Sequence, residues 1–301
     1  MQSVHKAVLS KEVVENLTKA SVLSHGVKNI WYLDGTLGGA SHAMEIAKHF
    51  KGKLSIIAFD RDLEAIKRAE KNLKGKSENL ILVNDNFRNL DVVIATNKIE
   101  NVDLVLLDLG LSSDELDNSG KGFTFQKDEP LLMTMGDPQS YPFTAKDIVN
   151  SWDQSVIANI LFGYSQEKFA YRIARAIANY RNKKAIETTL ELAEIIKSAV
   201  PSFYRRGKIH PATKSFQALR IAVNDELNAL REGLDKAYKA LNKGGRLAVI
   251  SFHSLEDKIV KEYFRNQKES NLITKKPIVA SEEEINENPR SRSAKLRVIE
   301  K

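Results

Sequence analysis

Short apolar runs alternate with helix-like stretches in the N-terminal part of the chain. The runs are Ile30–Asp34, Ser55–Asp60, Leu80–Val83 and Val102–Asp108. Near-continuous apolar runs are typical of strands that are covered on both faces, as in a parallel sheet. Between them lie Ala43–Phe50 and Leu63–Leu73, and in the latter apolar residues recur at helical spacing. This alternation predicts a doubly wound α/β domain.

The pattern changes after the fourth run. Between about residues 118 and 211 no strand-like run occurs, and helical periods dominate. These periods cover Ile148–Leu161, Gln166–Arg181 and Leu190–Val200. We therefore predict that residues 118–211 form a helical insertion domain for substrate recognition, placed within an α/β domain made of residues 1–117 and 212–301.

The α/β pattern returns in the C-terminal part of the chain. A long amphipathic helix is predicted at Ser215–Leu241, and glycines follow it directly. The later elements are a strand at Arg246–Phe252, a helix at Leu255–Asn266, and strand candidates at Leu272–Ala280 and Lys295–Glu300. Five parallel strands and a terminal strand pair give a seven-stranded sheet. This plan predicts the Rossmann-like α/β fold of S-adenosylmethionine-dependent methyltransferases rather than that of a dehydrogenase.

Composition excludes several classes of protein. The chain has no cysteine, which excludes a disulfide framework, Cys-ligated zinc and a Cys nucleophile. Its six histidines show no ligand spacing, so we predict no metal site. No apolar run approaches the roughly 20 residues that span a bilayer, and the N-terminus has no signal-peptide core. We therefore expect a cytoplasmic protein without membrane association, and its net charge of +7 favours a polyanionic partner.

The turn after the first strand is a candidate cofactor site, because ligands of open α/β sheets bind outside the carboxyl ends of the strands. The glycines of the turn Asp34–His42 allow close backbone approach, but they do not form a GxGxxG motif. S-adenosylmethionine has no phosphates, so it needs no phosphate cradle. Ser41 is either a helix N-cap or a ligand contact, and His42 is either a packing residue or a ligand contact.

The ends of the second and third strands offer groups suited to adenosine. Asp60 lies 22 residues beyond Gly38, a spacing at which an acid can accept both ribose hydroxyls. The alternative is an acid that starts a helix, a role that Asp62 can fill. Asp85 and Phe87 provide a polar group for the amino edge of adenine and a ring for its face, and the alternative for Phe87 is a place in the core.

Asp108 ends the fourth strand at the centre of the predicted sheet, just before the flexible Gly110. An exocyclic base amine is a poor nucleophile because its lone pair is delocalised into the ring. An acceptor that bonds its N–H localises this lone pair, so Asp108 is a catalytic candidate for direct transfer driven by positioning. The alternative is that Asp108 binds the amino-acid end of the cofactor. His253 follows the fifth strand at the same edge, beside a pair, Ser254 and Asp257, that resembles a capping box.

Ten short motifs occur in one order along nearly the whole chain. They are His5–Leu9, Asp34–Gly38, Asp60–Asp62, Asn86–Phe87, Leu107–Ser113, Lys121–Phe125, His210–Thr213, Phe216–Arg220, Ser251–Asp257 and Asn288–Ala294. With them the chain resembles the 16S ribosomal RNA cytosine-N4 methyltransferase family, of the RsmH or MraW type. The resemblance implies methyl transfer from S-adenosylmethionine to the N4 amine of a cytidine, in the small ribosomal subunit or a late assembly intermediate.

The resemblance also implies particular site residues. Cofactor contacts are expected at Ala40, Ser41, His42, Asp60, Phe87, Asp108 and Glu115. Ser112, in the same motif as Asp108, joins Asp108 and His253 as a catalytic candidate. The chain departs from the family where Ala40 and Ser41 replace Gly-Gly and where Glu115 replaces Gln, a carboxylate that does not donate a hydrogen bond when ionised. The oligomeric state, including a homodimer, is left open.

Basic residues gather in and next to the predicted insertion. No acidic residue occurs between Ser198 and Asn224, and Tyr204 is interleaved with the basic residues as a possible stacking group. Beside it, the predicted helix Gln166–Arg181 carries a basic stripe, for which a solvated face is the alternative. The predicted RNA-binding residues are Arg172, Arg175, Arg205, Arg206, Lys208, His210, Lys214 and Arg220. A third basic cluster lies near the C-terminus.

Three other functions compete with this interpretation. A DNA amino-methyltransferase shares the chemistry, but it usually has a Pro-Pro-aromatic run where this chain has Leu109, Gly110 and Leu111. A nicotinamide-dependent oxidoreductase is disfavoured because GxGxxG is missing. A non-enzymatic RNA-binding factor on the same fold is disfavoured by the acids that end the strands, and cofactor binding would separate it from an enzyme.

Overall fold

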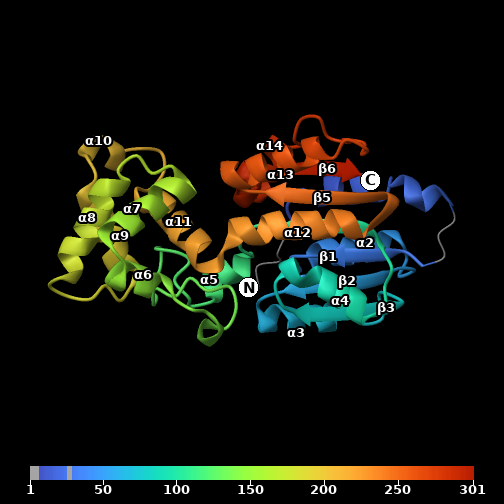
Figure 1. Cartoon of the computed structure of the whole chain (residues 1–301), viewed down its shortest axis with the longest axis horizontal. Coiled ribbons are helices and arrows are strands. Elements are labelled where there is room, and N and C mark those ends of the chain that lie inside the picture. The colour runs from blue at the N-terminus through green and yellow to red at the C-terminus, as the bar shows by residue number, and fades with distance from the viewer. Residues whose placement is uncertain (1–6, 26–28) are drawn as a thin grey trace. The chain divides into compact units, whose positions relative to one another are not determined.

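A computed structural model describes residues 7–25 and 29–301 of the chain, so His5 and Lys6 of the first motif lie outside the described residues. The chain forms two compact units (Figure 1). One contains the residues up to Gly110 together with Leu227–Lys301, and the other is Leu111–Glu226. The predicted boundaries were 118 and 212. The helical unit is larger because Leu111 and Leu116 at one end and Phe216 and Leu219 at the other pack in its core.

The first unit is built on one sheet. Its strands are β1 (Trp31–Asp34), β2 (Ser55–Asp60), β3 (Asn79–Asn84), β4 (Val102–Asp108), β5 (Leu241–Ser251) and β6 (Lys295–Glu300). They lie in the order β3-β2-β1-β4-β5-β6, with only β6 antiparallel to its neighbour. The chain order reverses between β1 and β4, which are adjacent. The carboxyl ends of these two strands therefore form the position where such sheets bind ligands.

Alternate residues of each strand pack on opposite faces of the sheet. Tyr32 and Leu104 belong to one apolar cluster, and Leu33 and Val105 belong to the other. The first face is covered by α1 (Ser10–Leu17), α2 (Ser41–His49) and α3 (Leu63–Leu73). The second is covered by α4 (Leu90–Thr96), α12 (Glu226–Ala240) and α13 (Ser254–Asn266). Burial on both faces explains the near-continuous apolar runs, since each fully buried Leu or Ile stabilises the fold by ~1.5–3 kcal/mol.

The described residues contain six strands in the sheet, so the predicted count of seven is wrong. The segment predicted as a strand, Leu272–Ala280, makes only isolated bridges, one at its edge and one at Ile278. Between these bridges the Oγ1 atom of Thr274 accepts the Val298 N–H, a role that a strand carbonyl would otherwise fill. Pro277 has no N–H to donate. The segment then continues into the short helix α14 (Glu282–Glu287).

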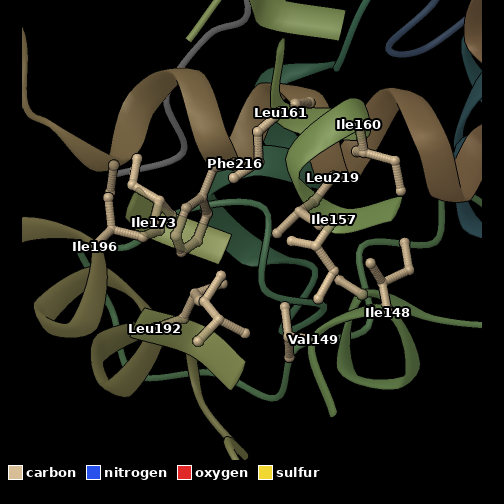
Figure 2. Packing of buried hydrophobic residues seen from close by; sticks show 14 of the residues in the cluster. Ile148, Val149, Ile157, Ile160, Leu161, Ile173, Leu192, Ile196, Phe216 and Leu219 are labelled. Carbon is tan, nitrogen blue, oxygen red and sulfur yellow. The ribbon is translucent and has the colours of Figure 1, made fainter. Parts of the chain in front are cut away.

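The second unit is helical. Its helices are α5 (Ser113–Asn118), α6 (Ala145–Ser151), α7 (Gln154–Ser165), α8 (Ala170–Arg181), α9 (Thr189–Ala199), α10 (Ser202–Arg205) and α11 (Ala212–Asn224). Figure 2 shows apolar side chains of α6, α7, α8, α9 and α11 packed against one another, with Phe216 and Leu219 among them. The apolar spacing that predicted helices in this part of the chain therefore marks the faces that form this core.

Two predicted helices are each broken in the structure. The predicted helix Ile148–Leu161 is interrupted between α6 and α7, where Trp152 and Asp153 have extended backbones. The predicted helix Ser215–Leu241 is interrupted at Asp225, which adopts φ 50° and ψ 39° between α11 and α12. Asp tolerates this left-handed conformation better than most residues because its short side chain bonds locally. Apolar spacing continues across both breaks, so periodicity alone did not reveal them.

Candidate active site

Asp34 and Asp108 end the two central strands, β1 and β4. Asp34 is buried at 1% exposure, and its carboxylate accepts hydrogen bonds from Tyr32 Oη at 2.8 Å and Thr36 N at 3.1 Å. Burial raises the pKa of Asp34, an effect that His42 and the Tyr32 hydroxyl partly oppose. The Thr36 hydroxyl accepts the Asp108 N–H at 2.7 Å, which ties the turn after β1 to the end of β4.

His42 brings an imidazole to the same place. It lies in the first turn of α2, is 7% exposed, and its Nε2 is 3.4 Å from Oδ2 of Asp108. Burial lowers the pKa of His42, but Asp108 and Asp34 together outweigh this effect and raise it above its ordinary value. Nδ1 of His42 and Oδ1 of Asp108 are buried without a hydrogen-bond partner. Because buried polar atoms are normally paired, these two atoms mark where a bound molecule would complete the site.

The glycine turn brings backbone close to these side chains. A Cβ on Gly35 would lie 2.3 Å from Leu107 Cδ2, so any larger residue would force the Leu107 side chain to move. Ala40 adopts φ 62° and is fully buried, in a left-handed conformation that disfavours residues with a Cβ. Ala40, not Ser41, is the N-cap residue of α2, and no side chain caps that end. The N-cap interpretation of Ser41 is therefore wrong.

Asp60 ends β2 with its carboxylate held by backbone. Oδ2 accepts the Gly38 N–H at 2.7 Å, and Oδ1 accepts the Asp62 N–H at 2.8 Å. Burial raises the pKa of Asp60 to about 6 against these two bonds. Asp62, not Asp60, caps α3 by accepting the Glu64 N–H at 3.1 Å. Capping is thus assigned to Asp62, and the remaining lone pairs of the Asp60 carboxylate suit hydroxyl donors.

Phe87 and Asp85 follow β3. The Phe87 side chain is half-buried against the core and lies next to Gly35 on one side and Gly233 of α12 on another. The Asp85 carboxylate accepts hydrogen bonds from Asn86 N at 2.6 Å and Asn89 Nδ2 at 2.9 Å. Phe87 therefore packs in the core. This does not exclude the predicted adenine contact, since a ring fixed by packing can also present one face to an adenine.

His253 caps α13. Its Nδ1 accepts the Glu256 N–H at 3.3 Å, while Glu256 Oε2 accepts the N–H groups of Phe252 at 2.8 Å and His253 at 3.2 Å. The capping box is thus His253 with Glu256, and the predicted box of Ser254 with Asp257 is wrong. Asp257 instead accepts a hydrogen bond from Arg297 Nε at 2.7 Å. Glu256 is only 3% exposed, and its Oε1 lies 3.1 Å from Nε2 of His253, a buried nitrogen that has no hydrogen-bond partner.

Ser112 and Glu115 lie in the helical unit, where they form the capping box of α5. Glu115 N donates to Ser112 Oγ at 3.1 Å, and Ser112 N donates to Glu115 Oε2 at 2.8 Å. The structure gives both residues a capping role in that unit. Their roles toward cofactor and substrate stay predictions.

The predicted RNA-binding residues all belong to the helical unit, and most of them are exposed. Arg220 differs, because its guanidinium forms two bonds of 2.8 Å with the Glu226 carboxylate. His210 stacks on Phe125 with ring centroids 4.6 Å apart, and Lys214 reaches the Gln166 carbonyl at 3.4 Å. Tyr204, which the sequence suggested for stacking, points its hydroxyl at Glu167. The more exposed aromatic residue beside it is Phe203.

Sequence reasoning missed two positioning residues, Tyr32 and Thr36. Tyr32 lies two residues before Asp34 on the same strand, so strand periodicity could have placed the two side chains on one face. No sequence signal pairs Thr36 with Asp108, since their bond depends on strand order. Among the described residues, no cluster of three or more His, Cys, Asp or Glu side chains could hold a metal, and no helix is long and apolar enough to cross a membrane.

Comparison with known proteins identifies the family. The model of the MraW methylase family matches residues 2–301. The chain belongs to the MraW methylase family. Proteins named ribosomal RNA small subunit methyltransferase H are 44% identical in Acetivibrio thermocellus, across all of both chains, and 44% identical in Carboxydothermus hydrogenoformans, across all of this chain and 99% of that one. The protein of that name from a Paenibacillus species is 43% identical across 99% of each chain.

Membership of the MraW methylase family confirms the resemblance drawn from the motifs. It also confirms the expectation of an S-adenosylmethionine-dependent methyltransferase, and the observed sheet confirms the Rossmann-like fold. The oxidoreductase and the non-enzymatic factor are disfavoured accordingly. The residues at the carboxyl ends of β1, β2 and β4 fit the cofactor, because they provide a carboxylate for a ribose, a close backbone turn, and two buried polar atoms without partners.

Proposed function

We propose that this MraW-family methylase transfers a methyl group from S-adenosylmethionine to the exocyclic N4 amine of a cytidine in 16S ribosomal RNA. The cofactor supplies a methyl group on a sulfonium, which is reactive enough to be attacked directly. The observation that carries the proposal is the pair formed by the buried His42 and the half-buried Asp108 at the reversal point of the sheet, in which His42 Nδ1 and Asp108 Oδ1 have no hydrogen-bond partner. Relatives at 44% identity carry names that state small-subunit ribosomal RNA methylation.

Asp108 acts on the acceptor amine in this mechanism. Nε2 of His42 lies 3.4 Å from Oδ2 and orients the carboxylate, while the Thr36 hydroxyl fixes the backbone of Asp108 by accepting its N–H. Oδ1 then accepts one N–H of the amine, which draws the nitrogen lone pair out of conjugation and toward the methyl group. Such fixed acceptors act without reorganisation during the reaction, an effect typically worth several kcal/mol. The proton released from nitrogen passes through Asp108 to solvent.

Other residues of the first unit would hold the cofactor. The Asp60 carboxylate accepts the ribose hydroxyls with the lone pairs that Gly38 and Asp62 leave free. Phe87 presents its packed ring to the adenine. Ala40, Ser41 and His42 line the turn for the methionine end. Glu115 belongs to the helical unit, and its contact with the ammonium group is proposed from the family resemblance alone. Ser112 and His253 act as positioning residues through the turns they cap.

We further propose that the helical unit recognises the RNA. Its exposed basic side chains, Arg172, Arg175, Arg205, Arg206 and Lys208, together with His210 and Lys214, suit phosphate contacts. Arg220 would have to leave the Glu226 carboxylate before it could bind a phosphate. The target cytidine would leave its stack to reach Asp108, as in base flipping. The acceptor is proposed to be the small subunit or a late assembly intermediate in the cytoplasm. Light scattering on the purified chain would decide the oligomeric state, which the sequence leaves open.

Labelled methyl transfer tests the proposal. Purified small subunits that lack their own modification are incubated with the chain and labelled S-adenosylmethionine, and the RNA is digested to nucleosides. We expect the label in N4-methylcytidine. Label in another nucleoside would overturn the N4 assignment, and bound cofactor without labelled subunits or naked ribosomal RNA would overturn the acceptor. Label in methyladenine or methylcytosine of added DNA, with none in RNA, would favour the DNA amino-methyltransferase.

A further inference from the structure

One exposed surface of the helical unit combines a bare aromatic ring with positive charge. Phe203 on α10 is 66% exposed and Ile209 is 56% exposed. Arg205, Arg206 and Lys208 lie between them in sequence, and all three are exposed. We call these five residues the α10 platform. An exposed ring offers a face for stacking and the neighbouring basic residues offer positive charge, so the platform is a candidate binding surface.

The platform is fixed by a buried carboxylate. Glu167 is fully buried, and its Oε2 accepts a hydrogen bond from the Tyr204 hydroxyl at 2.7 Å. Its Oε1 accepts the Phe169 N–H at 2.9 Å. The Tyr204 ring also meets the Phe169 ring edge to face, with centroids 5.0 Å apart. Glu167 therefore joins α10 to the start of α8, and its carboxylate is hydrogen-bonded within the fold rather than exposed at the surface.

The same contacts orient Phe203. Its ring meets Phe169 in a T-shaped contact, with centroids 6.1 Å apart and an interplanar angle of 64°. This contact uses little of the ring, because two thirds of the residue stays exposed. A ring held in place loses little conformational entropy when a planar ligand stacks on it. Phe203 is therefore preorganised for stacking.

The charge around the ring selects the ligand. No acidic residue occurs from Ser198 to Asn224, and Lys168, beside Glu167, is exposed as well. Positive side chains around an exposed ring match an unpaired nucleic-acid strand, in which bases stack on aromatic residues and phosphates meet Arg and Lys. A duplex would offer phosphates but no free base face. A folded acidic protein would use the charges but would have no need of an exposed ring.

We infer that the α10 platform binds an unpaired RNA segment, with one base stacked on Phe203 and the flanking phosphates at Arg205, Arg206 and Lys208. This inference rests on the proposed function for the identity of the RNA. It adds Phe203 as the residue on which an unpaired base stacks. Neither Phe203 nor Ile209 was among the residues that the sequence suggested for RNA binding.

Fluorescence anisotropy with a labelled unpaired fragment of small-subunit ribosomal RNA tests the inference without any turnover. The variants are Phe203→Ala, Phe203→Trp, which keeps a stacking face, and Phe203→Leu, which keeps apolar bulk. Leu190→Ala, at a 45% exposed apolar residue of α9, is the matched control. We expect Phe203→Ala to weaken binding about 10-fold. Phe203→Trp and the control should bind like the wild type, and Phe203→Leu should resemble Phe203→Ala.

Steady-state methylation of small subunits gives a second readout. Phe203→Ala should raise KM for the subunits about 10-fold and leave kcat unchanged, because the ring grips the substrate without touching the reacting atoms. Wild-type binding by Phe203→Ala or by Phe203→Leu would overturn the stacking role. A loss seen with subunits but not with naked RNA would assign the platform to a ribosomal protein and would also overturn it. RNA binding that depends on Phe203, without any methyl transfer, would sustain this inference while the proposed function failed.

Discussion

The ring of Phe87 fills the space that a side chain on Gly233 would occupy. A Cβ built on Gly233 would lie 2.3 Å from Cε2 of Phe87, in the middle of α12. Gly→Ala inside a helix normally stabilises by ~1 kcal/mol. Here we expect Gly233→Ala to destabilise the protein by ~1–3 kcal/mol, because the ring must move within a packed core. Chemical denaturation measures the change in the free energy of unfolding. Calorimetric titration should show that Gly233→Ala binds S-adenosylmethionine more weakly than the wild type does.

A double-mutant cycle gives the control for this prediction. Phe87→Ala removes the ring, so adding Gly233→Ala to that variant should recover the ordinary helix gain of ~1 kcal/mol. If Gly233→Ala were stabilising in the wild-type background, the packing described for Phe87 would be wrong.

Cofactor binding should depend on pH through Asp60. Burial raises the pKa of Asp60 to about 6, and ribose hydroxyls bond more strongly to the ionised carboxylate. The affinity for S-adenosylmethionine should therefore rise as pH increases through about 6 and level off above it. Asp60→Asn should remove this dependence, and Asp60→Ala should weaken binding about 10- to 100-fold, as expected for bonds to a charged group. An affinity that is flat in the wild type through this range would exclude Asp60 as the ribose acceptor.

Stability should depend on pH through His42. Its pKa is raised above the ordinary value of 6.5 by Asp108, Asp34 and Glu284, despite the opposing effect of burial. The stabilising contribution of the charged ring is then complete below pH 6.5 and is lost as pH rises through the raised value. Compared with His42→Gln, the wild type should lose more of its free energy of unfolding as pH rises from 6.5 through the raised pKa of His42. Parallel curves for the two proteins would refute the ion pair.

His253 should act through its cap rather than as a base. Asn is a good N-cap residue, so His253→Asn should keep both stability and turnover, whereas His253→Ala should lose ~1 kcal/mol of stability. At a temperature where both variants are folded, their kcat values should agree. A large loss of kcat in His253→Asn, with the fold intact, would restore the catalytic interpretation.

Much of the sheet could be predicted because strands that are buried on both faces have near-continuous apolar sequences. Ser55–Asp60, Val102–Asp108 and Lys295–Glu300 are strands with the predicted bounds. The prediction of a strand at Leu272–Ala280 was wrong. There the Thr274 hydroxyl, rather than a backbone carbonyl, accepts the Val298 N–H, and apolar content does not reveal this. The prediction of one continuous helix from Ser215 to Leu241 was wrong for a related reason. The left-handed φ of Asp225 breaks the helix but leaves the apolar spacing unchanged.

The sequence could nominate residues for the candidate site but could not predict the contacts among them. Asp60 and Asp108 stand out because each follows an apolar run. The choice between His253 with Glu256 and Ser254 with Asp257 could not be made, because both pairs have the same spacing at the same helix start. The side-chain conformation of His253 decides between them. The hydrogen bond that fixes the half-buried Tyr204 is made by Glu167, which is distant in sequence.

Single-turnover methyl transfer by Asp108→Ala, at saturating S-adenosylmethionine and small subunits, tests the central claim most directly. Asp91→Ala, at an exposed acid of α4, is the control, and circular dichroism confirms that both variants are folded. Loss of the acceptor for the amine N–H should slow formation of N4-methylcytidine about 100-fold or more, while the control transfers at the wild-type rate. Transfer by Asp108→Ala at a near wild-type rate would contradict the role given to this carboxylate.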